Sequence, residues 1–471
     1  MPWSLLSVEL AVCAWILIML AADLVVPAAR KSALWMLALA GVAVCAGLLA
    51  RQVPAGPASF QQIFLVDGFS RYFKGLFLLT AAVVIVMTRG VPGSSIANAG
   101  AFYMLLFTAL LGMLVLASIN DLLMLFLGLE LLSFSLYIMA AYLKTDPRSV
   151  EAGMKYLILG SVSTGFLVYG IALLYGFVGG TGFDAIRLAL TTEPAPLTAQ
   201  AGLLLILAGL GFKIAAVPFQ MWVPDVYEGA PTPVVALLSV GSKMAGVVAM
   251  LRVLYGACAP LADLWTGVLA MLSAATLLYG NLAAIPQTNI KRLLGYSSIG
   301  HAGYLLMGLS TGLLQGMTAV GYYLLAYLFS NLTVFLVVAT ASEALGGEAL
   351  DDYKGLSKRS GLLAAAMFVG LLSLAGVPPL AGFVGKLLVL LSSVDANTLW
   401  LAAIGAVNVA ISLYYYLMVV KRMYLDAPAD AAPLRVPALT KATLLFLVLG
   451  IFAVGIVQEP FLRQIAKAVG G

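Results

Sequence analysis

Residues 209–244 read GLGFKIAAVPFQMWVPDVYEGAPTPVVALLSVGSKM and place Lys213 and Lys243 inside segments otherwise apolar enough to be membrane helices. A charged side chain at the centre of a bilayer costs about 2.5 to 3.5 kcal/mol on insertion scales, so it must face a partner or a water-filled cavity. Pro218 follows Lys213 by five residues, and a proline removes a backbone donor and crowds the preceding turn. The stretch therefore predicts a membrane helix that breaks just after a buried lysine, as discontinuous transporter helices do at ion sites.

Two more charges lie in equally apolar surroundings. Glu130 lies within NDLLMLFLGLELLSFSLYIMAAY, and Lys386 lies within SLAGVPPLAGFVGKLLVLL. A lysine near the end of a helix can instead extend to the membrane interface as an anchor, and this interpretation stays open for each lysine taken alone. Four buried charges in one chain favour an ion-handling site over four independent anchors.

The composition excludes a soluble globule. Hydrophobic residues make up 63% of the 471 residues and charged residues only 10%, which leaves too little polar side chain to cover a water-exposed surface. The chain is therefore predicted to be a polytopic membrane protein with the lipid bilayer around it. Its net charge of +5 is interpreted as a consequence of membrane topology, and no nucleic-acid partner is expected.

No metal or cofactor is expected in this chain. The three cysteines, Cys13, Cys45 and Cys258, lie far apart, a spacing that predicts neither a disulfide framework nor an iron-sulfur cluster. The single histidine, His301, rules out a multi-histidine haem or zinc site built from this chain alone. The sequence also lacks a phosphate-binding loop and a dinucleotide fingerprint.

A helix needs roughly 20 residues to cross a hydrocarbon core of about 30 Å. The sequence contains fourteen apolar segments of that kind, at residues 5–26, 33–51, 71–88, 99–117, 120–143, 152–178, 200–222, 232–257, 262–283, 292–311, 315–341, 361–391, 398–420 and 440–462. This pattern predicts an all-α polytopic membrane protein with about fourteen transmembrane helices.

The basic residues indicate how the chain is oriented. Connections after odd-numbered segments hold fourteen lysines and arginines, and the opposite side holds six: Arg51, Arg71, Lys74, Arg187, Arg463 and Lys467. Because basic residues concentrate in cytoplasmic loops, the odd-numbered connections are predicted to be cytoplasmic. An even number of spans then places both termini on the periplasmic side of a bacterial inner membrane.

The seventh and twelfth helices are predicted to be broken. Lys213 precedes Pro218, and Lys386 follows the pair Pro378-Pro379. Each broken helix is the fourth of a five-span unit, and since five is odd, consecutive units cross the membrane in opposite directions, as inverted-topology repeats do. We therefore predict four parts: residues 1–98 with helices 1–3, residues 99–257 and 258–424 as two inverted five-helix repeats, and residues 425–471 with the last span.

Three segments carry a family resemblance: KIAAVPFQMWVPDVYEGAPTPVVALLSVGSK, KRLLGYSSIGHAGYLL and SLAGVPPLAGFVGK. They resemble the antiporter-like membrane subunits of respiratory complex I, and the combination is most similar to the N type. The resemblance covers most of the chain, from about Ala99 to Tyr424. The related M type and the multi-subunit cation/proton antiporters share the proline-rich core, but the M type has glutamate at the position of Lys386.

The resemblance implies roles for individual residues. Glu130, Lys213, Lys243 and Lys386 match the family's proton-translocating charges, and Lys155 matches a further lysine in the sixth span. A desolvated lysine binds its proton less tightly and a nearby carboxylate restores the affinity, so moving one partner can switch proton occupancy. Glu130 is then expected to modulate Lys213. Lys243 and His301 are expected to relay protons through internal water toward Lys386, although His301 could equally be a hydrogen-bonded packing residue.

One position departs from the family pattern. Many members have histidine after the Pro-Phe pair, whereas this chain has Gln220, which cannot titrate. If the histidine carries protons elsewhere, water must replace it here. We expect a water molecule ordered by Gln220.

The resemblance implies a proton-translocating subunit of bacterial NADH:quinone oxidoreductase, with neighbours of the K and M types. NADH, FMN, iron-sulfur clusters and quinone are expected in partner subunits. The alternatives are a subunit of a multi-subunit sodium/proton antiporter, which would use the same lysines, and a purely structural scaffold, whose buried charges could be replaced without loss of pumping.

Overall fold

A computed structural model describes residues 3–52, 58–90, 98–428, 430 and 432–470. Residues 91–97, next to the predicted boundary between residues 98 and 99, lie outside the described residues. In chain order the elements are η1 (Trp3–Leu6), α1 (Ser7–Val25), η2 (Ala28–Ala33), α2 (Leu34–Arg51), β1 (Ala58–Phe60), β2 (Phe64–Val66), α3 (Gly68–Gly90), α4 (Ala99–Ala117), α5 (Leu122–Ala140), α6 (Pro147–Val178), α7 (Phe183–Thr192), α8 (Leu197–Ile214), α9 (Trp222–Gly229), α10 (Thr232–Leu237), η3 (Leu238–Ser242), α11 (Lys243–Leu251), η4 (Arg252–Ala257), η5 (Ala259–Leu261), α12 (Ala262–Ala284), α13 (Ile290–Leu309), α14 (Leu314–Leu345), α15 (Leu356–Arg359), α16 (Gly361–Ala375), α17 (Ala381–Asp395), α18 (Leu399–Tyr424), α19 (Ala438–Ile456) and α20 (Gln458–Gly470).

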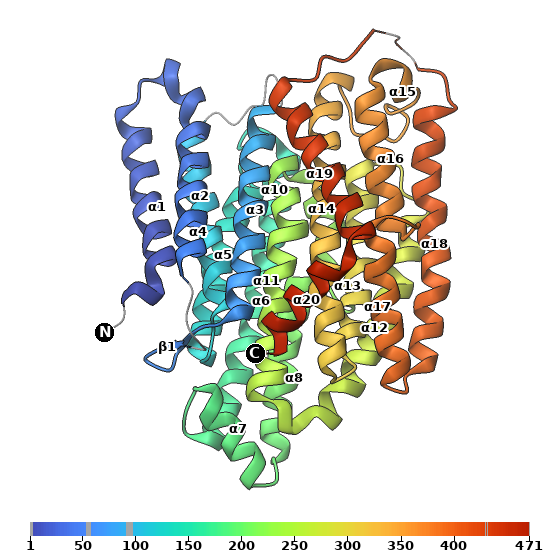
Figure 1. Ribbon diagram of the computed structural model, residues 1–471. Helices are drawn as coiled ribbons and strands as arrows, with labels where there is room; N and C mark the ends of the chain where they lie inside the picture. Colours follow the sequence, from blue (N-terminus) through green and yellow to red (C-terminus); the bar gives the residue numbers. More distant parts are fainter. Residues whose placement is uncertain (1–2, 53–57, 91–97, 429, 431, 471) are drawn as a thin grey trace.

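The long helices run side by side in one bundle (Figure 1). Within the described residues, 12 helices are long and apolar enough to cross a membrane. The remaining two predicted segments correspond to α13, with 20 residues, and to the pair α16 and α17, with 15 residues each. The predicted all-helical polytopic fold is therefore confirmed.

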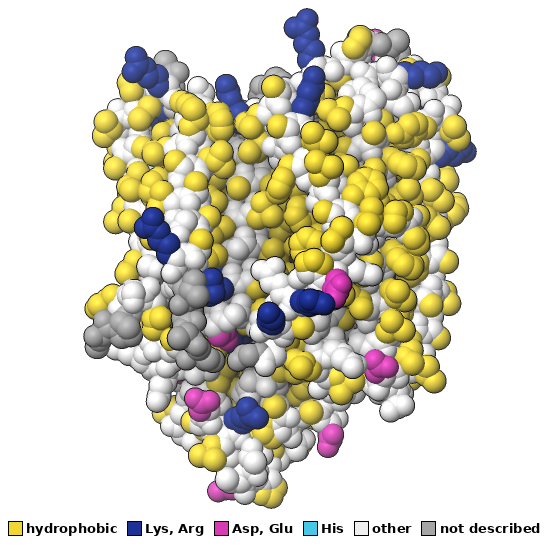
Figure 2. Space-filling view, in the orientation of Figure 1, with side chains coloured by type: hydrophobic (Ala, Val, Ile, Leu, Met, Phe, Trp, Pro, Cys, Tyr) yellow, Lys and Arg dark blue, Asp and Glu magenta, His cyan; other side chains and the backbone are white. Residues whose placement is uncertain are grey.

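The surface of the bundle has the polarity of a membrane protein. Figure 2 shows apolar side chains over the middle of one face and basic side chains along its upper edge. Large apolar residues such as Leu17, Leu127 and Val407 are more than half exposed. Because the lipid-facing side of a span is as apolar as its packed side, these residues are in keeping with a lipid environment.

The structure adds short elements that the sequence analysis did not predict. Strands β1 and β2 form an antiparallel hairpin, in which Phe64 and Val66 are buried and the turn holds Gln61 and Gln62 at positive φ. The fourteenth span was predicted to reach residue 462, but α19 ends at Ile456 and a separate helix, α20, follows. The prediction ran too far because α20 also carries apolar residues, although on one face only.

Both predicted helix breaks are confirmed. Helix α8 ends at Ile214, and the next residue, Ala215, has a left-handed backbone with φ of 67°. Helix α16 ends at Ala375, and Gly376 follows with φ of 89°. Each break also contains a cis peptide bond before a proline, Val217-Pro218 in the first and Pro378-Pro379 in the second. Both bonds have the same spacing from the left-handed residue. The two breaks thus share one backbone geometry.

Helices α6 and α14 also correspond. Each has 32 residues, and each ends at a left-handed glycine, Gly179 with φ of 74° and Gly346 with φ of 75°. Glycine is favoured there because a side chain would strain the left-handed backbone. Each of the two helices is followed by a short helix, α7 or α15, and these lie at opposite ends of the bundle (Figure 1).

A further correspondence lies at the starts of α5 and α13. Asp121 caps α5 and forms an isolated antiparallel bridge with Gly182, in the loop after α6. Asn289 caps α13 and forms the same kind of bridge with Ala349, in the loop after α14. The side-chain oxygen of each cap accepts hydrogen bonds from free amides of the first helical turn. The second and third helices of each predicted unit are therefore joined in the same way.

Candidate proton-translocation site

Lys213 lies in the last turn of α8 and is only 4% exposed. Its ammonium group donates to Ser133 Oγ of α5 at 3.0 Å and lies 3.5 Å from the hydroxyl of Tyr156 of α6. Its aliphatic part packs against α11 at Gly246, where an added Cβ would lie 3.2 Å from Lys213 Cγ. The lysine is therefore enclosed by three neighbouring helices, and its hydrogen-bond partners among the described residues are hydroxyl groups and not carboxylates.

Glu130 is half-buried on α5, one helical turn before Ser133. Its Oε1 accepts a hydrogen bond of 2.7 Å from Thr164 Oγ1 of α6. Among the described residues no basic group lies within 4.0 Å of Glu130, so it makes no ion pair with Lys213. Residues three apart on a helix share a face. Glu130 therefore lies on the same face of α5 as Ser133, which accepts a hydrogen bond from Lys213.

Lys243 begins α11, directly after the π-helical segment η3. Its ammonium group donates to the backbone oxygen of Ser298 and, at 2.6 Å, to Ser298 Oγ of α13. Ser298 Oγ also lies 3.1 Å from the hydroxyls of Tyr227 and Tyr327. A π-helical turn often occurs at functional sites because it changes the face on which a side chain points. Ser298 is the centre of a hydroxyl cluster around Lys243.

His301 lies one turn after Ser298 on α13 and is buried. Its Nδ1 lies 2.7 Å from the hydroxyl of Tyr323 of α14, and its Nε2 lies 3.2 Å from the hydroxyl of Tyr416 of α18. The hydroxyl of Tyr416 bonds in turn to Ser297 Oγ. Both ring nitrogens therefore have hydroxyl partners that can donate or accept.

Lys386 lies on α17, after the second break. Its ammonium group donates to the backbone oxygen of Ala375 at 2.9 Å and to Ser412 Oγ of α18 at 3.3 Å. It also lies 4.9 Å from the ring centroid of Tyr304. A small cavity of about 10 Å³ separates Lys386 from His301. Its other lining residues are Tyr323, Ala326, Tyr327, Ser330, Ser373, Leu374 and Gly382.

That cavity is close to the smallest volume that holds one water molecule, and its lining offers several polar partners. One water there could connect the histidine ring to the ammonium group of Lys386 by hydrogen bonds.

Gln220 lies in the turn between α8 and α9 and is buried. Its Oε1 has no hydrogen-bond partner among the described residues. A buried amide oxygen without a partner costs about 1 to 3 kcal/mol, so a water molecule beside it is the expected solution. The observation supports the predicted ordered water without testing it.

The structure does not bring Lys155 together with the other predicted residues. Its side chain is 43% exposed and forms ion pairs with Glu151 at 2.6 Å and Asp225 at 2.7 Å. Arg292 binds the other oxygen of Asp225 at 2.8 Å. Burial raises the pKa of Asp225, but hydrogen bonds from Lys155 and Arg292 outweigh it and hold that pKa below its ordinary value. Lys155 therefore belongs to a surface ion-pair cluster.

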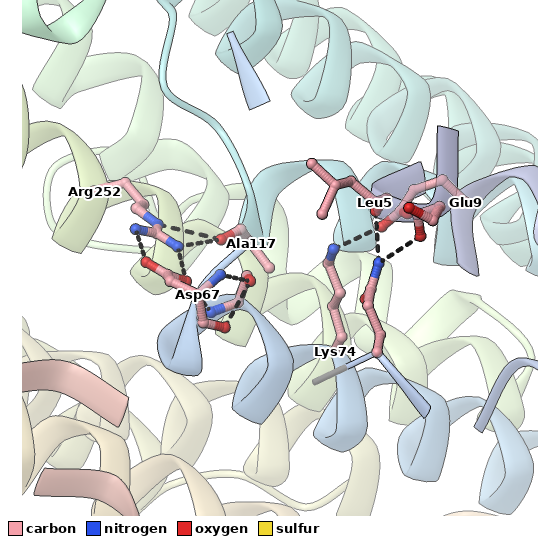
Figure 3. A network of polar contacts seen from close by, with 9 residues as sticks. Leu5, Glu9, Asp67, Lys74, Ala117 and Arg252 are labelled. Atoms are coloured by element: carbon pink, nitrogen blue, oxygen red, sulfur yellow. Dashed lines mark hydrogen bonds and ion pairs between the residues drawn. The ribbon is translucent and has the colours of Figure 1, made fainter. Parts of the chain in front are cut away.

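A second set of buried charges, shown in Figure 3, was not predicted from the sequence. Lys74 of α3 was counted among the basic residues of the outer side, but its side chain is 0% exposed and its ammonium group lies 2.7 Å from Glu9 of α1. Arg252 binds Asp67 through two hydrogen bonds of 2.7 and 2.8 Å and also donates to the backbone oxygen of Ala117. The available signal was an acidic residue, Glu9, within the first apolar segment.

The broken helices and the buried lysines at their ends define an antiporter-like polytopic membrane protein. A model of the NADH:quinone oxidoreductase/Mrp antiporter transmembrane family matches residues 119–412, and the chain belongs to that family. The chain is similar to NADH-quinone oxidoreductase subunit N of Moorella thermoacetica, with 42% identity over 97% of this chain and 96% of that protein.

Solved structures agree with this assignment. A chain of respiratory complex I from Thermus thermophilus is 32% identical, with a TM-score of 0.84 over 98% of this chain and 99% of that chain. A chain of the Mrp complex from Dietzia sp. DQ12-45-1b has a TM-score of 0.89 over 100% of this chain and 97% of that chain, at 20% identity. The second likeness establishes the shared fold alone.

Proposed function

We propose that this chain is the N-type membrane subunit of a bacterial NADH-quinone oxidoreductase and translocates protons through its buried charges. Electron transfer, with NADH, FMN, iron-sulfur clusters and quinone, takes place in partner subunits, and neighbours of the K and M types flank the chain. The complex lies in the inner membrane, with both termini of this chain on the periplasmic side. The relationship to proteins named subunit N, two of which match over nearly the whole chain, supports this assignment.

The observation that supports the proton-translocating role is the set of buried lysines and hydroxyl groups in the interior of the bundle. Lys213, Lys243 and Lys386 are each almost fully buried, and each ammonium group donates to a serine hydroxyl. Hydroxyl groups can accept one proton while donating another, so they can pass protons in either direction. A scaffold would gain nothing from three buried ammonium groups without carboxylate partners, because each costs desolvation free energy.

In the proposed path, Lys213 receives the proton on the side of α5 and α6, and Glu130 modulates its affinity through Ser133 without direct contact. Lys243 and Ser298 form the middle of the path. His301 passes the proton through the water-sized cavity to Lys386. Gln220 orders water beside the first break, and Lys155 takes no part in the path.

The two five-helix units, residues 99–257 and 258–424, are proposed to be inverted repeats. The shared break geometry, the 32-residue third helices and the matched bridges at Asp121 and Asn289 support this proposal. Residues 1–98 and 425–471 are then additions to the repeats, packed against them. A broken helix in each unit gives each a site where free backbone groups can bind an ion or water.

The test has two parts. The tagged chain is purified in mild detergent, and co-purifying flavin and iron-sulfur subunits are expected. Inside-out membrane vesicles are then given NADH, and proton uptake is measured with and without sodium. Sodium-dependent flux with no NADH oxidation in the purified assembly would instead assign the chain to a sodium/proton antiporter. Full pumping by assembled variants without the buried lysines would assign it a scaffold role.

A further inference from the structure

A groove lies between α2, α3 and the C-terminal helix α20, away from the buried lysines. Its volume is about 700 Å³, which is within the usual range of small-molecule sites. Apolar and small side chains of α2 and α3 form most of its wall, among them Leu39, Val42, Ala46, Leu49, Leu78 and Ala82. Helix α20 packs against α3 and α14 and also lines the groove, through Gln464, Lys467 and Ala468.

Glycine keeps the groove open. Gly75 of α3 lines it, and an added Cβ there would meet only Leu49 Cδ2, at 4.0 Å. The chain's own side chains therefore do not fill this space. Since α2 and α3 are both membrane-crossing helices, the apolar wall faces the region of lipid chains.

The end of the groove beside α20 is cationic. Arg71 and Tyr72 of α3 and Gln464 and Lys467 of α20 line it. Among the described residues, neither Arg71 nor Lys467 has a carboxylate within 4.0 Å. Arg71 Nε and the hydroxyl of Tyr72 are buried atoms without a hydrogen-bond partner. The groove thus offers two charges without a carboxylate partner, Arg71 and Lys467, at one end of an apolar wall.

The charges are unusual for this side of the membrane. Sequence analysis assigned only six basic residues to it, and Arg71 and Lys467 are two of them. Figure 2 shows basic side chains gathered over α3 and α20. Basic residues on this side do not determine how the chain is oriented in the membrane, because that orientation is set by the basic residues of cytoplasmic loops. A bound anion would account for their position.

We propose that this groove binds an anionic phospholipid. An acyl chain lies along the apolar wall of α2 and α3, and the headgroup phosphate accepts hydrogen bonds from Arg71 and Lys467. Arginine and lysine are the usual ligands of phosphate, and basic pockets between membrane helices bind anionic headgroups. A partner helix would cover the apolar wall but would leave both cations uncompensated, so the charge pattern favours a lipid.

Lipid binding to the full chain, in the assembly that purifies with it, tests the proposal. After delipidation, the sample is titrated with dioleoylphosphatidylglycerol or dioleoylphosphatidylcholine, and bound lipid is counted by native mass spectrometry. One phosphatidylglycerol per chain is expected to bind in preference to phosphatidylcholine. Arg71→Ala combined with Lys467→Ala should weaken its binding by about tenfold or more, since both cations that hold the phosphate are removed.

Arg463→Ala is the matched control, because Arg463 is on α20 but is 74% exposed, pairs with Glu459 and does not line the groove. It should bind phosphatidylglycerol as the wild type does. Gly75→Leu, which fills the open space, should reduce binding without removing a charge. Equal binding of the two lipids, equal loss in Arg463→Ala, or a partner polypeptide cross-linked to Gly75→Cys would overturn the proposal. These readouts do not depend on proton pumping.

Discussion

The ammonium group of Lys386 donates a hydrogen bond of 2.9 Å to the backbone oxygen of Ala375, the last residue of α16, so it reaches back across the second helix break. Lys213 lies in the last turn of α8, just before the first break. Lys213 precedes its break in the sequence and Lys386 follows its break. Both lysines nevertheless lie at the C-terminal end of the helix before the break, α8 for Lys213 and α16 for the ammonium group of Lys386. Free carbonyl groups and the helix dipole favour a cation there.

The first prediction concerns topology. Arg187 is on α7 and Lys358 is on α15, and these helices lie at opposite ends of the bundle (Figure 1). Single cysteines at the two positions should therefore react with a membrane-impermeant thiol reagent from opposite sides. The positive-inside rule predicts that Lys358→Cys is cytoplasmic and Arg187→Cys is periplasmic. Labelling of both from the same side of intact cells would contradict the arrangement.

The second prediction concerns Gln220. Gln220→His should retain most activity, because an imidazole can also bind water in the turn. Gln220→Leu should slow NADH-driven proton uptake several-fold, since it removes the unpartnered buried oxygen that would order that water. Assembly of each variant is checked by gel filtration. Wild-type rates in the leucine variant would show that no water path depends on this side chain.

The third prediction concerns Ser298, the hydroxyl shared by Lys243, Tyr227 and Tyr327. Ser298→Ala leaves Lys243 with a backbone oxygen but interrupts the hydroxyl cluster, so proton uptake should fall about tenfold while the complex still assembles. Ser310→Ala is the control. Ser310 is also buried, but among the described residues its hydroxyl donates only to the backbone oxygen of Met307, and its loss should leave uptake unchanged.

The fourth prediction concerns the ion pair between Asp67 and Arg252. Burial raises the pKa of Asp67, but Arg252 and the hydrogen bonds of Ser70 outweigh it and hold that pKa below its ordinary value. A carboxyl group whose pKa is lowered by folding stabilises the fold above its unfolded pKa of about 3.9, and this stabilisation is lost as the pH falls through the folded value. The melting temperature of the wild type should therefore drop in acid.

Asp67→Asn should lower the melting temperature at neutral pH and show a smaller drop in acid. Removing one partner of a buried pair costs about 3 to 5 kcal/mol, because the other charge is left alone. Adding Arg252→Leu to Asp67→Asn should restore part of the loss. Additive losses in the double variant would mean that the pair is not coupled.

Sequence analysis found the residues whose chemistry conflicts with their surroundings. Lys213, Lys243 and Lys386 were visible because a charge in an apolar segment is costly, and the breaks were visible because proline cannot continue a helix. Serine causes no such conflict, because its hydroxyl can bond to a backbone carbonyl of its own helix. Tyrosine causes none either, because most of its side chain is an apolar ring. The partnership of Ser298 with Lys243 joins two helices that are distant in the sequence, so it depends on the arrangement of the bundle and could not be predicted.

The pair of Glu9 and Lys74 was missed for a related reason. Each residue lies close to the start of its helix, where a charge is commonly an interfacial anchor. Only the packing of the N-terminal helices shows that Lys74 is fully buried and that Glu9 is its partner. A pairing between distant helices leaves no periodic signal in the sequence.

The last prediction separates proton carriers from residues that only tune them. A carrier must bind and release a proton in each cycle, so Lys213→Ala and Lys386→Ala should reduce NADH-driven proton uptake by about tenfold or more. Lys213→Arg should fail as well, because guanidinium keeps the charge but stays protonated at any accessible pH. Glu130→Asp should retain more activity than Glu130→Gln, since the carboxylate acts at a distance and only its charge is needed. Uptake is measured in inside-out vesicles with assembly verified. If assembled Lys213→Arg pumped as well as the wild type, Lys213 would be a fixed charge and not a carrier.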